Sequence, residues 1–256
     1  MAFTPDKRIK AQVIAGEKGY VSGLQEAEKI FLMHDIKTKS RFRDGDEIRE
    51  GDVVLSLHGS SRKIFSISRS ALNLLSRMSG ITTLTRKYVN ILDKKNYRAR
   101  IMATRKTTPL LRHFEKKAVV AGGGLPHRMG LYDMILIKHD HLKMFPEGAA
   151  EAVRKAKKSK FNSKIEVEAD TITEAIVAAK SAADIIMLDN MSPQEVKEVV
   201  KKLTKLGFRK KVKIEVSGGI NINNVSKYAA CGVDFISVGE LTHSPRSVDL
   251  SLKVVS

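Results

Sequence analysis

Positively charged side chains recur in short polar groups between Thr104 and His141. Apolar segments separate these groups, whereas a solvated helical face spreads its charges along a helical period. A single surface cation is most often solvated, but several cations at the ends of secondary-structure elements predict a binding site for carboxylates or phosphates. The candidates are Arg105, Lys106, Arg112, His127, Arg128 and Lys138.

Acidic and glycine-containing motifs end four later apolar segments. Glu168, Asp189, Ser217 and Gly239 stand at intervals of 21, 28 and 22 residues. Each interval fits one βα unit, so the four residues are expected on the C-terminal rim where parallel barrels assemble their sites. Ser217-Gly218-Gly219 precedes a predicted helix, and glycines there let a phosphate approach the backbone at the helix N-terminus. Such a rim suits a substrate with carboxylates, a phosphate and a hydroxyl-rich or metal-bound portion.

The second half of the chain alternates between strands and helices, which predicts a parallel sheet with helices outside. We expect a TIM-like, incomplete α/β barrel, with an open doubly wound sheet as the alternative. Arg105 and Lys106 are expected after a strand, beside a helix that begins at Pro109 after a threonine N-cap. The predicted strands are 98–103, 134–138, 164–168, 184–189, 212–217 and 234–239, and the predicted helices are 109–120, 146–159, 172–181, 192–206 and 222–231.

The first part of the chain predicts a smaller α+β domain. Strands are expected at 9–15 and 53–57, a helix at 24–33, and a second helix from Ile64 that breaks at Ser79-Gly80. Arg69 lies on that second helix, where spacing alone indicates an ordinary surface charge. We therefore expect an N-terminal domain over 1–90, joined by residues 244–256, and a catalytic domain over 91–243.

Composition narrows the classes of protein that are possible. The 256 residues are 42% hydrophobic, and no apolar run is as long as a membrane span. The net charge of +18 attracts anions, but aromatic residues are only 5% and no nucleic-acid-binding motif is present, so neither nucleic acid nor membrane is expected as a partner. The N-terminus lacks a signal peptide and Cys231 stands alone, so a cytoplasmic location and a buried, unreactive thiol are expected. The Gly122-Gly123-Gly124 run is expected to be structural.

These motifs together resemble the quinolinate phosphoribosyltransferase family, also called nicotinate-nucleotide pyrophosphorylase (decarboxylating). The resemblance covers nearly the whole chain. It is carried by T-R-K-T-T-P-x-L-R from 104, H-R-x-G-L-x-D from 127, L-I-K-x-x-H from 136, S-R-S-A-L-N-L-L-S-R-M-S-G-I (68–81), E-V-E (166–168), L-D-N (188–190), S-G-G-I (217–220) and V-G-E-L-T-H-S (238–244).

The resemblance implies a pentosyltransferase that joins quinolinate to phosphoribosyl pyrophosphate, giving nicotinate mononucleotide, pyrophosphate and CO2 for NAD synthesis. It implies Mg²⁺ as cofactor and a homodimer or higher homo-oligomer with the active site at the subunit interface. The implied quinolinate ligands are Arg69, contributed across that interface, and Arg105, His127, Arg128 and Lys138. The implied ligands of phosphoribosyl pyrophosphate are Lys106, Glu168, Asp189, Ser217, Gly218, Gly219 and Gly239, of which Glu168 and Asp189 also face Mg²⁺.

Two departures from the family pattern lie beside the expected base site. Pro126 stands before His127-Arg128 where an asparagine is common, and His139-Asp140 follows Lys138 where Asp-Asn is common. The nearest alternative activity is a phosphoribosyltransferase that uses nicotinate or another acidic ring without decarboxylation. An alternative of another class is a non-catalytic protein that binds nucleic acid or anionic metabolites.

Overall fold

The computed structural model describes residues 5–159 and 163–255 and divides the chain into two units. The first unit comprises the residues up to 86, residues 108–124 and the residues from 241 onward. The second unit comprises residues 87–107 and 125–240. The C-terminal residues thus group with the N-terminal unit, and so does segment 108–124, which the sequence had assigned to the catalytic domain.

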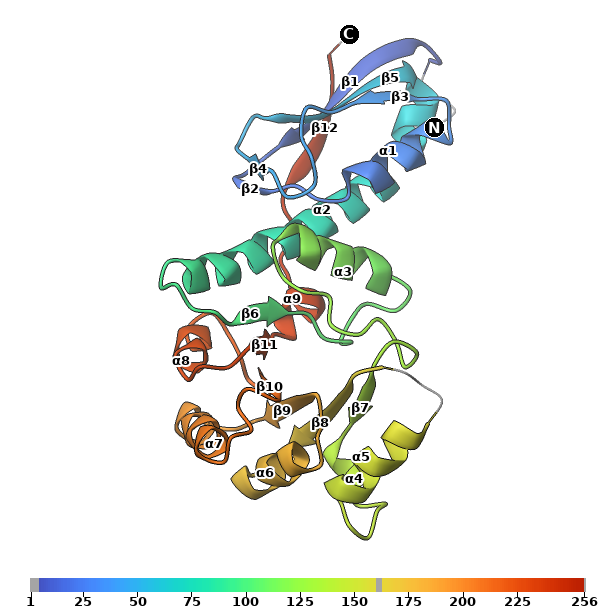
Figure 1. Ribbon diagram of the computed structural model, residues 1–256. Coiled ribbons are helices and arrows are strands. Elements are labelled where there is room, and N and C mark those ends of the chain that lie inside the picture. The colour runs from blue at the N-terminus through green and yellow to red at the C-terminus, as the bar shows by residue number, and fades with distance from the viewer. Residues whose placement is uncertain (1–4, 160–162, 256) are drawn as a thin grey trace. The chain divides into compact units, whose positions relative to one another are not determined.

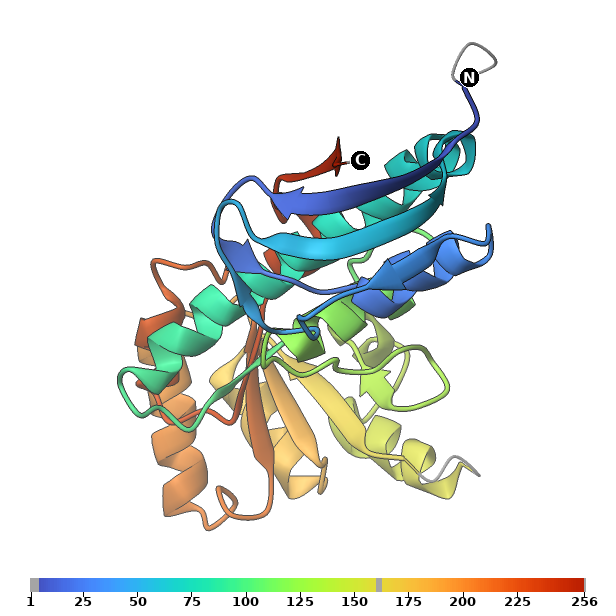
Figure 2. The same ribbon diagram turned by 90° about the horizontal axis from the view of Figure 1, so that it is seen from above.

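The first unit is an α+β unit built on an antiparallel sheet with the strand order β12-β1-β5-β3. Figure 2 shows this sheet lying over α1 and α2. The strand and helix expected before residue 34 and the strand expected at 53–57 are confirmed. The elements are β1 (Arg8–Ala15), β2 (Gly19–Tyr20), α1 (Leu24–Leu32), β3 (Lys37–Lys39), β4 (Glu47–Ile48), β5 (Val53–Ser60), α2 (Ser61–Asp93), α3 (Arg112–Ala121), α9 (Glu240–His243) and β12 (Leu250–Val254). Residues 87–93 of α2 and the first residue of α9 belong to the second unit.

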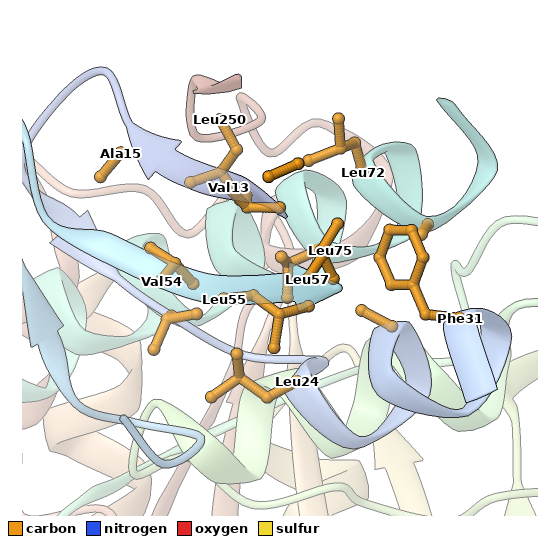
Figure 3. Close-up of a cluster of buried hydrophobic side chains, with 14 of the residues drawn as sticks. Val13, Ala15, Leu24, Phe31, Val54, Leu55, Leu57, Leu72, Leu75 and Leu250 are labelled. Atoms are coloured by element: carbon orange, nitrogen blue, oxygen red, sulfur yellow. The ribbon is translucent and has the colours of Figure 1, made fainter. Parts of the chain in front are cut away.

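Side-chain alternation along the strands creates the core of this unit. Val13 of β1 pairs with Leu55 of β5, and both side chains are fully buried. Leu75 of α2 and Phe31 of α1 belong to the same buried cluster (Figure 3). Because alternate side chains of a strand point to opposite faces, the other face of the sheet carries polar residues, among them the exposed Lys37 and Lys39 of β3 and Lys253 of β12.

Helix α2 runs without interruption from Ser61 to Asp93, so the break predicted at Ser79-Gly80 is wrong. Gly80 is instead a packing residue, because a Cβ placed there would lie 2.0 Å from the carbonyl oxygen of Arg246. Ser79 is fully buried, and its hydroxyl accepts a hydrogen bond from the Ser22 N–H at 3.0 Å. Ser79 and Gly80, which resemble a helix terminator in sequence, therefore allow the segments around Ser22 and Arg246 to pack closely against α2.

We expect Gly80→Ala to destabilise the protein. The added methyl group forces the Arg246 backbone away, at a cost of about 1–3 kcal/mol, which exceeds the gain in helix propensity of about 1 kcal/mol at most. Urea unfolding followed by circular dichroism measures the change. Ser70→Ala, at an exposed position of the same helix, is the control and should leave the midpoint unchanged or slightly raised. Equal midpoints for Gly80→Ala and wild type contradict the packing role.

The second unit is an α/β unit with a parallel six-stranded sheet, and all six predicted strands are present. Figure 1 shows its helices on the outer side of the sheet. The elements are β6 (Arg100–Met102), β7 (Ile135–Ile137), α4 (His139–Leu142), α5 (Ala149–Lys158), β8 (Ile165–Ala169), α6 (Ile172–Lys180), β9 (Ile185–Asp189), α7 (Pro193–Lys205), β10 (Lys213–Ser217), α8 (Val225–Ala229) and β11 (Phe235–Ser237).

The strand order β6-β11-β10-β9-β8-β7 favours the incomplete barrel over the doubly wound sheet. Strands β7 to β11 follow one another in chain order, and the first strand, β6, pairs with the last, β11. A doubly wound sheet reverses its strand order in the middle. Among the described residues β6 and β7 are not paired with each other, although Leu125 continues the sheet through a parallel bridge to Met102. The barrel is therefore open at that point.

The predicted start of α7 agrees with the structure, whereas α3 and α8 start later than predicted. Helix α7 begins close to its predicted start at residue 192, and Ser192 caps it in a capping box with Glu195. Helix α3 begins at Arg112 and not at Pro109, because Leu110 has a φ of 66°, outside the helical range. The N–H and hydroxyl of Thr108 instead donate to the carboxylate of Glu115 at 3.0 and 2.8 Å. Helix α8 has only five residues and starts at Val225, later than the predicted start at 222.

Two smaller expectations are consistent with the structure. A Cβ on Gly122 would lie 2.6 Å from the Cβ of Thr85, so the glycine run has the expected structural role. Cys231 is buried, and burial raises the pKa of its thiol, as befits an unreactive cysteine. No helix in the described part of the chain is both long and apolar enough to cross a bilayer.

Candidate active site

The predicted site residues of the second unit gather at the carboxyl ends of its strands, which we call the strand-end rim. Every pairing between neighbouring strands of this sheet is parallel, so the carboxyl termini of all the strands lie at the same end of the sheet. Arg105 and Lys106 follow β6, Lys138 follows β7, Glu168 lies in β8, Asp189 and Ser217 end β9 and β10, and Gly239 follows β11.

Three carboxylates form the acidic part of the rim: Glu168 in β8, Asp170 just after that strand and Asp189 at the end of β9. Glu168, Asp170 and Asp189 each offer an oxygen within 4.8 Å of the others. Burial raises the pKa of Glu168, the negative charge of Asp189 raises it further, and the ammonium group of Lys138 lowers it. Oxygen donors of this kind are those that Mg²⁺ prefers. The group therefore fits a divalent cation or the hydroxyl groups of a sugar.

The turn after β10 exposes backbone in a form that a phosphate can approach. Gly218 and Gly219 have φ values of 88° and 63°, which favour glycine. A Cβ on Gly218 would lie 2.3 Å from Oδ1 of Asn190, whereas a Cβ on Gly219 would meet nothing within 4 Å. The sequence predicted that a helix N-terminus would follow this turn directly, but α8 starts six residues after Gly219 and is short. A phosphate at this position would therefore contact the backbone of the turn and not a helix N-terminus.

Two arginine side chains lie near each other at the cationic part of the rim. Arg128 is 9% exposed, and its Nη1 donates to the carbonyl oxygen of Met134 at 3.3 Å. Burial lowers the pKa of Arg128, and the positive charge of Arg105 lowers it further. Nε of Arg105 is buried without a hydrogen-bond partner among the described residues. A pair of like charges with an unsatisfied donor indicates a place for an anion.

His127 lies in a buried group of polar residues from three strands. Its side chain is 7% exposed, and its Nε2 lies 3.1 Å from Oε2 of Glu166 and 3.6 Å from Oε2 of Glu215. Burial lowers the pKa of His127, but the hydrogen bonds and negative charges of the two glutamates outweigh burial and raise it to about 9. Burial and the charge of Glu215 raise the pKa of Glu166. A pKa in this range favours the imidazolium form of His127 at neutral pH.

Comparison with known proteins identifies the family. The model described as "Quinolinate phosphoribosyl transferase, N-terminal domain" matches residues 1–79, and the corresponding C-terminal domain model matches residues 81–253. The chain belongs to the quinolinate phosphoribosyltransferase family. The resemblance seen in the sequence is thereby confirmed.

Curated relatives and solved structures of this family match almost the whole chain. A probable nicotinate-nucleotide pyrophosphorylase (carboxylating) of Archaeoglobus fulgidus is 42% identical over 251 residues, covering 98% of this chain and 96% of the relative. The protein of the same name in Bacillus subtilis is 38% identical over 97% of this chain and 84% of its own. The nicotinate-nucleotide pyrophosphorylase structure from Francisella tularensis has a TM-score of 0.91 at 35% identity and covers 99% of this chain and 88% of that one.

Two of the predicted site residues, Arg112 and Arg69, lie in the first unit. Arg112 is the first residue of α3, so the division of the chain separates it from the strand-end rim residues of the second unit. Arg69 is exposed on α2. Its exposure agrees with the surface position that spacing alone predicted, while its role in this quinolinate phosphoribosyltransferase remains a prediction from the family.

Sequence reasoning missed Glu166, Glu215 and Ser237 as functional candidates. All three are buried polar residues in strands. Glu166 lies two positions before Glu168, and Glu215 two before Ser217, so each shares a strand face with a predicted site residue. The signal was available, since an acidic residue at an alternate position of an otherwise apolar strand needs a partner.

Proposed function

We propose that this quinolinate phosphoribosyltransferase carries out its reaction at the strand-end rim, with the acid substrate held by the cations and the sugar substrate by the carboxylates and the glycine turn. The reaction joins quinolinate to phosphoribosyl pyrophosphate and releases pyrophosphate and CO2. The name "pyrophosphorylase (carboxylating)" describes the same reaction in the opposite direction. The observation that carries this proposal is the pair Arg105 and Arg128, with its unsatisfied buried donor, on the same rim as Glu168 and Asp189.

The cationic side of the rim suits a dicarboxylate. Quinolinate carries two carboxylates on neighbouring ring carbons, and planar guanidinium groups bind carboxylates with paired hydrogen bonds. Arg105, His127, Arg128 and Lys138 supply more positive charge than the single carboxylate of nicotinate requires. This excess favours the dicarboxylate over the alternative acid.

The other side of the rim suits phosphoribosyl pyrophosphate. The backbone of Ser217, Gly218, Gly219 and Gly239 would hold the 5-phosphate, and Lys106 would contact the diphosphate. Glu168 and Asp189 would face the ribose hydroxyls and hold Mg²⁺, which when bound supplies positive charge to the departing pyrophosphate.

The residues act on charge that develops during the reaction. The ring nitrogen of quinolinate forms a bond to C1 of the ribose as the bond from C1 to the pyrophosphate oxygen breaks. Positive charge then grows on the ribose, and the carboxylates of Glu168 and Asp189 stabilise it. The bond from ring carbon 2 to its carboxylate breaks next, and its electron pair stays on that carbon beside the cationic nitrogen until a proton replaces the CO2. The cations hold the ring in place throughout.

A product assay tests this function against its alternatives. With quinolinate labelled in its 2-carboxylate, we expect equal amounts of labelled CO2 and pyrophosphate, and no pyrophosphate with nicotinate. Pyrophosphate release with nicotinate in place of quinolinate favours the non-decarboxylating alternative. Salt-sensitive RNA binding without any turnover contradicts the proposal.

Removal of divalent metal should stop the reaction. We expect EDTA to lower pyrophosphate release by at least about 10²-fold, since the leaving pyrophosphate then lacks charge compensation. Added Mg²⁺ should restore the rate, while the thermal midpoint should stay the same because neither core depends on the ion. Full activity in EDTA would show that Glu168 and Asp189 act without a metal.

We also propose a cytoplasmic homodimer in which Arg69 completes the quinolinate site of the partner subunit. The support is the exposure of Arg69 on α2 and the family to which the chain belongs. Mixing inactive Arg69→Ala and Arg105→Ala variants after subunit exchange should restore about a quarter of the wild-type activity, because each mixed dimer has one intact site. Failure to restore activity, with mixed dimers shown by mass spectrometry, would place Arg69 in its own subunit's site or outside it.

A further inference from the structure

Three buried polar side chains around His127 have no role in the function described so far. Glu166 comes from β8, Glu215 from β10 and Ser237 from β11. Both glutamates are 0% exposed, and Ser237 is 3% exposed. We call Glu166, Glu215 and Ser237 the histidine anchor. Buried carboxylates are costly unless they are paired, so their presence beside the rim needs an explanation.

The contacts of the anchor converge on one ring nitrogen. The Ser237 hydroxyl donates to Oε1 of Glu215 at 2.6 Å, and Oε2 of Glu215 lies 3.6 Å from Nε2 of His127. Oε2 of Glu166 lies 3.1 Å from the same nitrogen. An ionised carboxylate can only accept, so beside ionised Glu166 the Nε2 of His127 carries a proton and donates it to Oε2 of Glu166, while Glu215 contributes its negative charge. The anchor thus fixes both the orientation of the ring and the position of one proton.

The protonation of the other nitrogen decides whether His127 can bind an acid. With Nε2 protonated, a neutral ring has a lone pair on Nδ1, which repels a carboxylate. An imidazolium has an Nδ1–H, which donates to a carboxylate. Burial lowers the pKa of His127, but its hydrogen bond to Glu166 and the negative charge of Glu215 outweigh burial and raise the pKa to about 9, which favours the imidazolium. The charged groups near the ring are Glu166 and Glu215, and Arg128 follows it in the chain.

We propose that Glu166, Glu215 and Ser237 are positioning residues, which orient His127 and keep it protonated so that its Nδ1–H donates to a carboxylate of quinolinate. This inference rests on the proposed role of His127 in binding quinolinate. The backbone of His127 supports it, because a φ of 53° is uncommon for a residue other than glycine and indicates that the surroundings determine the placement of this residue.

A double-mutant cycle tests the anchor. Glu166→Gln should raise KM for quinolinate by about 10- to 100-fold and leave KM for phosphoribosyl pyrophosphate within about twofold. In the His127→Ala background, the same substitution should change KM for quinolinate by less than about threefold, because its effect passes through the ring. Glu198→Gln on the exposed side of α7 is the control and should have no effect. Equal effects of Glu166→Gln in both backgrounds overturn the proposal.

Nuclear magnetic resonance of the wild-type enzyme gives a second reading that needs no variant to fold. Ring ¹⁵N shifts should show both nitrogens of His127 protonated at about pH 7.5, and protonation should persist well above the ordinary pKa of histidine. A neutral ring at that pH overturns the proposal. A stoichiometric metal ion that survives EDTA and shifts the His127 signals also overturns the proposal, because the imidazole of His127 and the carboxylates of Glu166 and Glu215 could together ligate an ion.

The two measurements separate this inference from the proposed function. If wild-type enzyme releases pyrophosphate and CO2 from quinolinate but the cycle is additive, the function stands and the anchor fails. If the wild type shows no turnover with quinolinate, the function fails, while the ring shifts still report whether Glu166 and Glu215 hold His127 protonated.

Discussion

The Arg105→Ala variant is expected to lose about 10³-fold in kcat/KM for quinolinate, chiefly through KM. Arg105 is half-buried, and its guanidinium Nε is buried without a hydrogen-bond partner among the described residues. An acid substrate would satisfy that donor, and removing one partner of a buried charged contact costs several kcal/mol. Steady-state kinetics of pyrophosphate release with varied quinolinate measures the effect.

Stability of the same variant distinguishes a binding role from a structural one. Burial lowers the pKa of Arg128, and the positive charge of Arg105 lowers it further, so the two guanidinium groups repel each other. The unliganded Arg105→Ala protein should therefore be at least as stable to urea as the wild type. Arg105→Lys should not restore full affinity, since an ammonium group cannot make the paired contact.

Arg100→Ala is the matched control for Arg105→Ala. Arg100 begins β6, whereas Arg105 follows its carboxyl end, and Arg100 is exposed. Its removal should leave kcat/KM within about twofold, as is usual for exposed side chains away from a site. Activity of Arg105→Ala close to that of wild type would falsify the placement of quinolinate at this part of the rim.

The Asp189→Asn and Glu168→Gln variants are expected to lose about 10²- to 10³-fold in kcat. The two carboxylates stabilise positive charge that exists on the ribose only in the transition state, so the loss should appear in kcat more than in KM. The double variant should lose much less than the product of the two effects, because the groups act together. Glu198→Gln should again behave as the wild type.

The Asp189→Asn variant should also show a changed dependence of activity on pH. Burial raises the pKa of Glu168 above its ordinary value, and the charge of Asp189 raises it further. Activity should fall as the pH drops through this raised pKa, because Glu168 then becomes neutral. Without the charge of Asp189, the acid limb of the remaining activity should move to lower pH. An acid limb that stays in place would show that another group controls it.

The arrangement of the rim could be predicted from sequence because each strand carries its own signal. A buried apolar run that ends in a polar residue, as at Asp189 and Ser217, fixes both the strand and the place where it ends. Parallel pairing then brings these ends together without further information. The alternation of strands and helices after residue 98 was sufficient for the fold class.

Features that depend on contacts distant in the chain could not be predicted in this way. Gly80 reads as a helix break because the sequence does not show the Arg246 backbone that passes over it. The partnership of His127 with Glu166 and Glu215 joins three separate segments, and from sequence His127 was assigned to the substrate alone. Thr108 donates to Glu115, seven residues later, and accepts from Arg77, so its partners are not the N–H groups of a helix start.

The lysines on the outer strands of the first unit limit how copies of the protein can associate. Strands β3 and β12 border the four-stranded sheet, and each leaves unpaired backbone groups that could recruit a strand from another molecule. Lys37 and Lys39 on one border and Lys253 on the other place like charges where an identical strand would have to dock. Electrostatic repulsion between these lysines therefore opposes edge-to-edge strand pairing between copies of the protein. This repulsion should weaken as salt screens the charges.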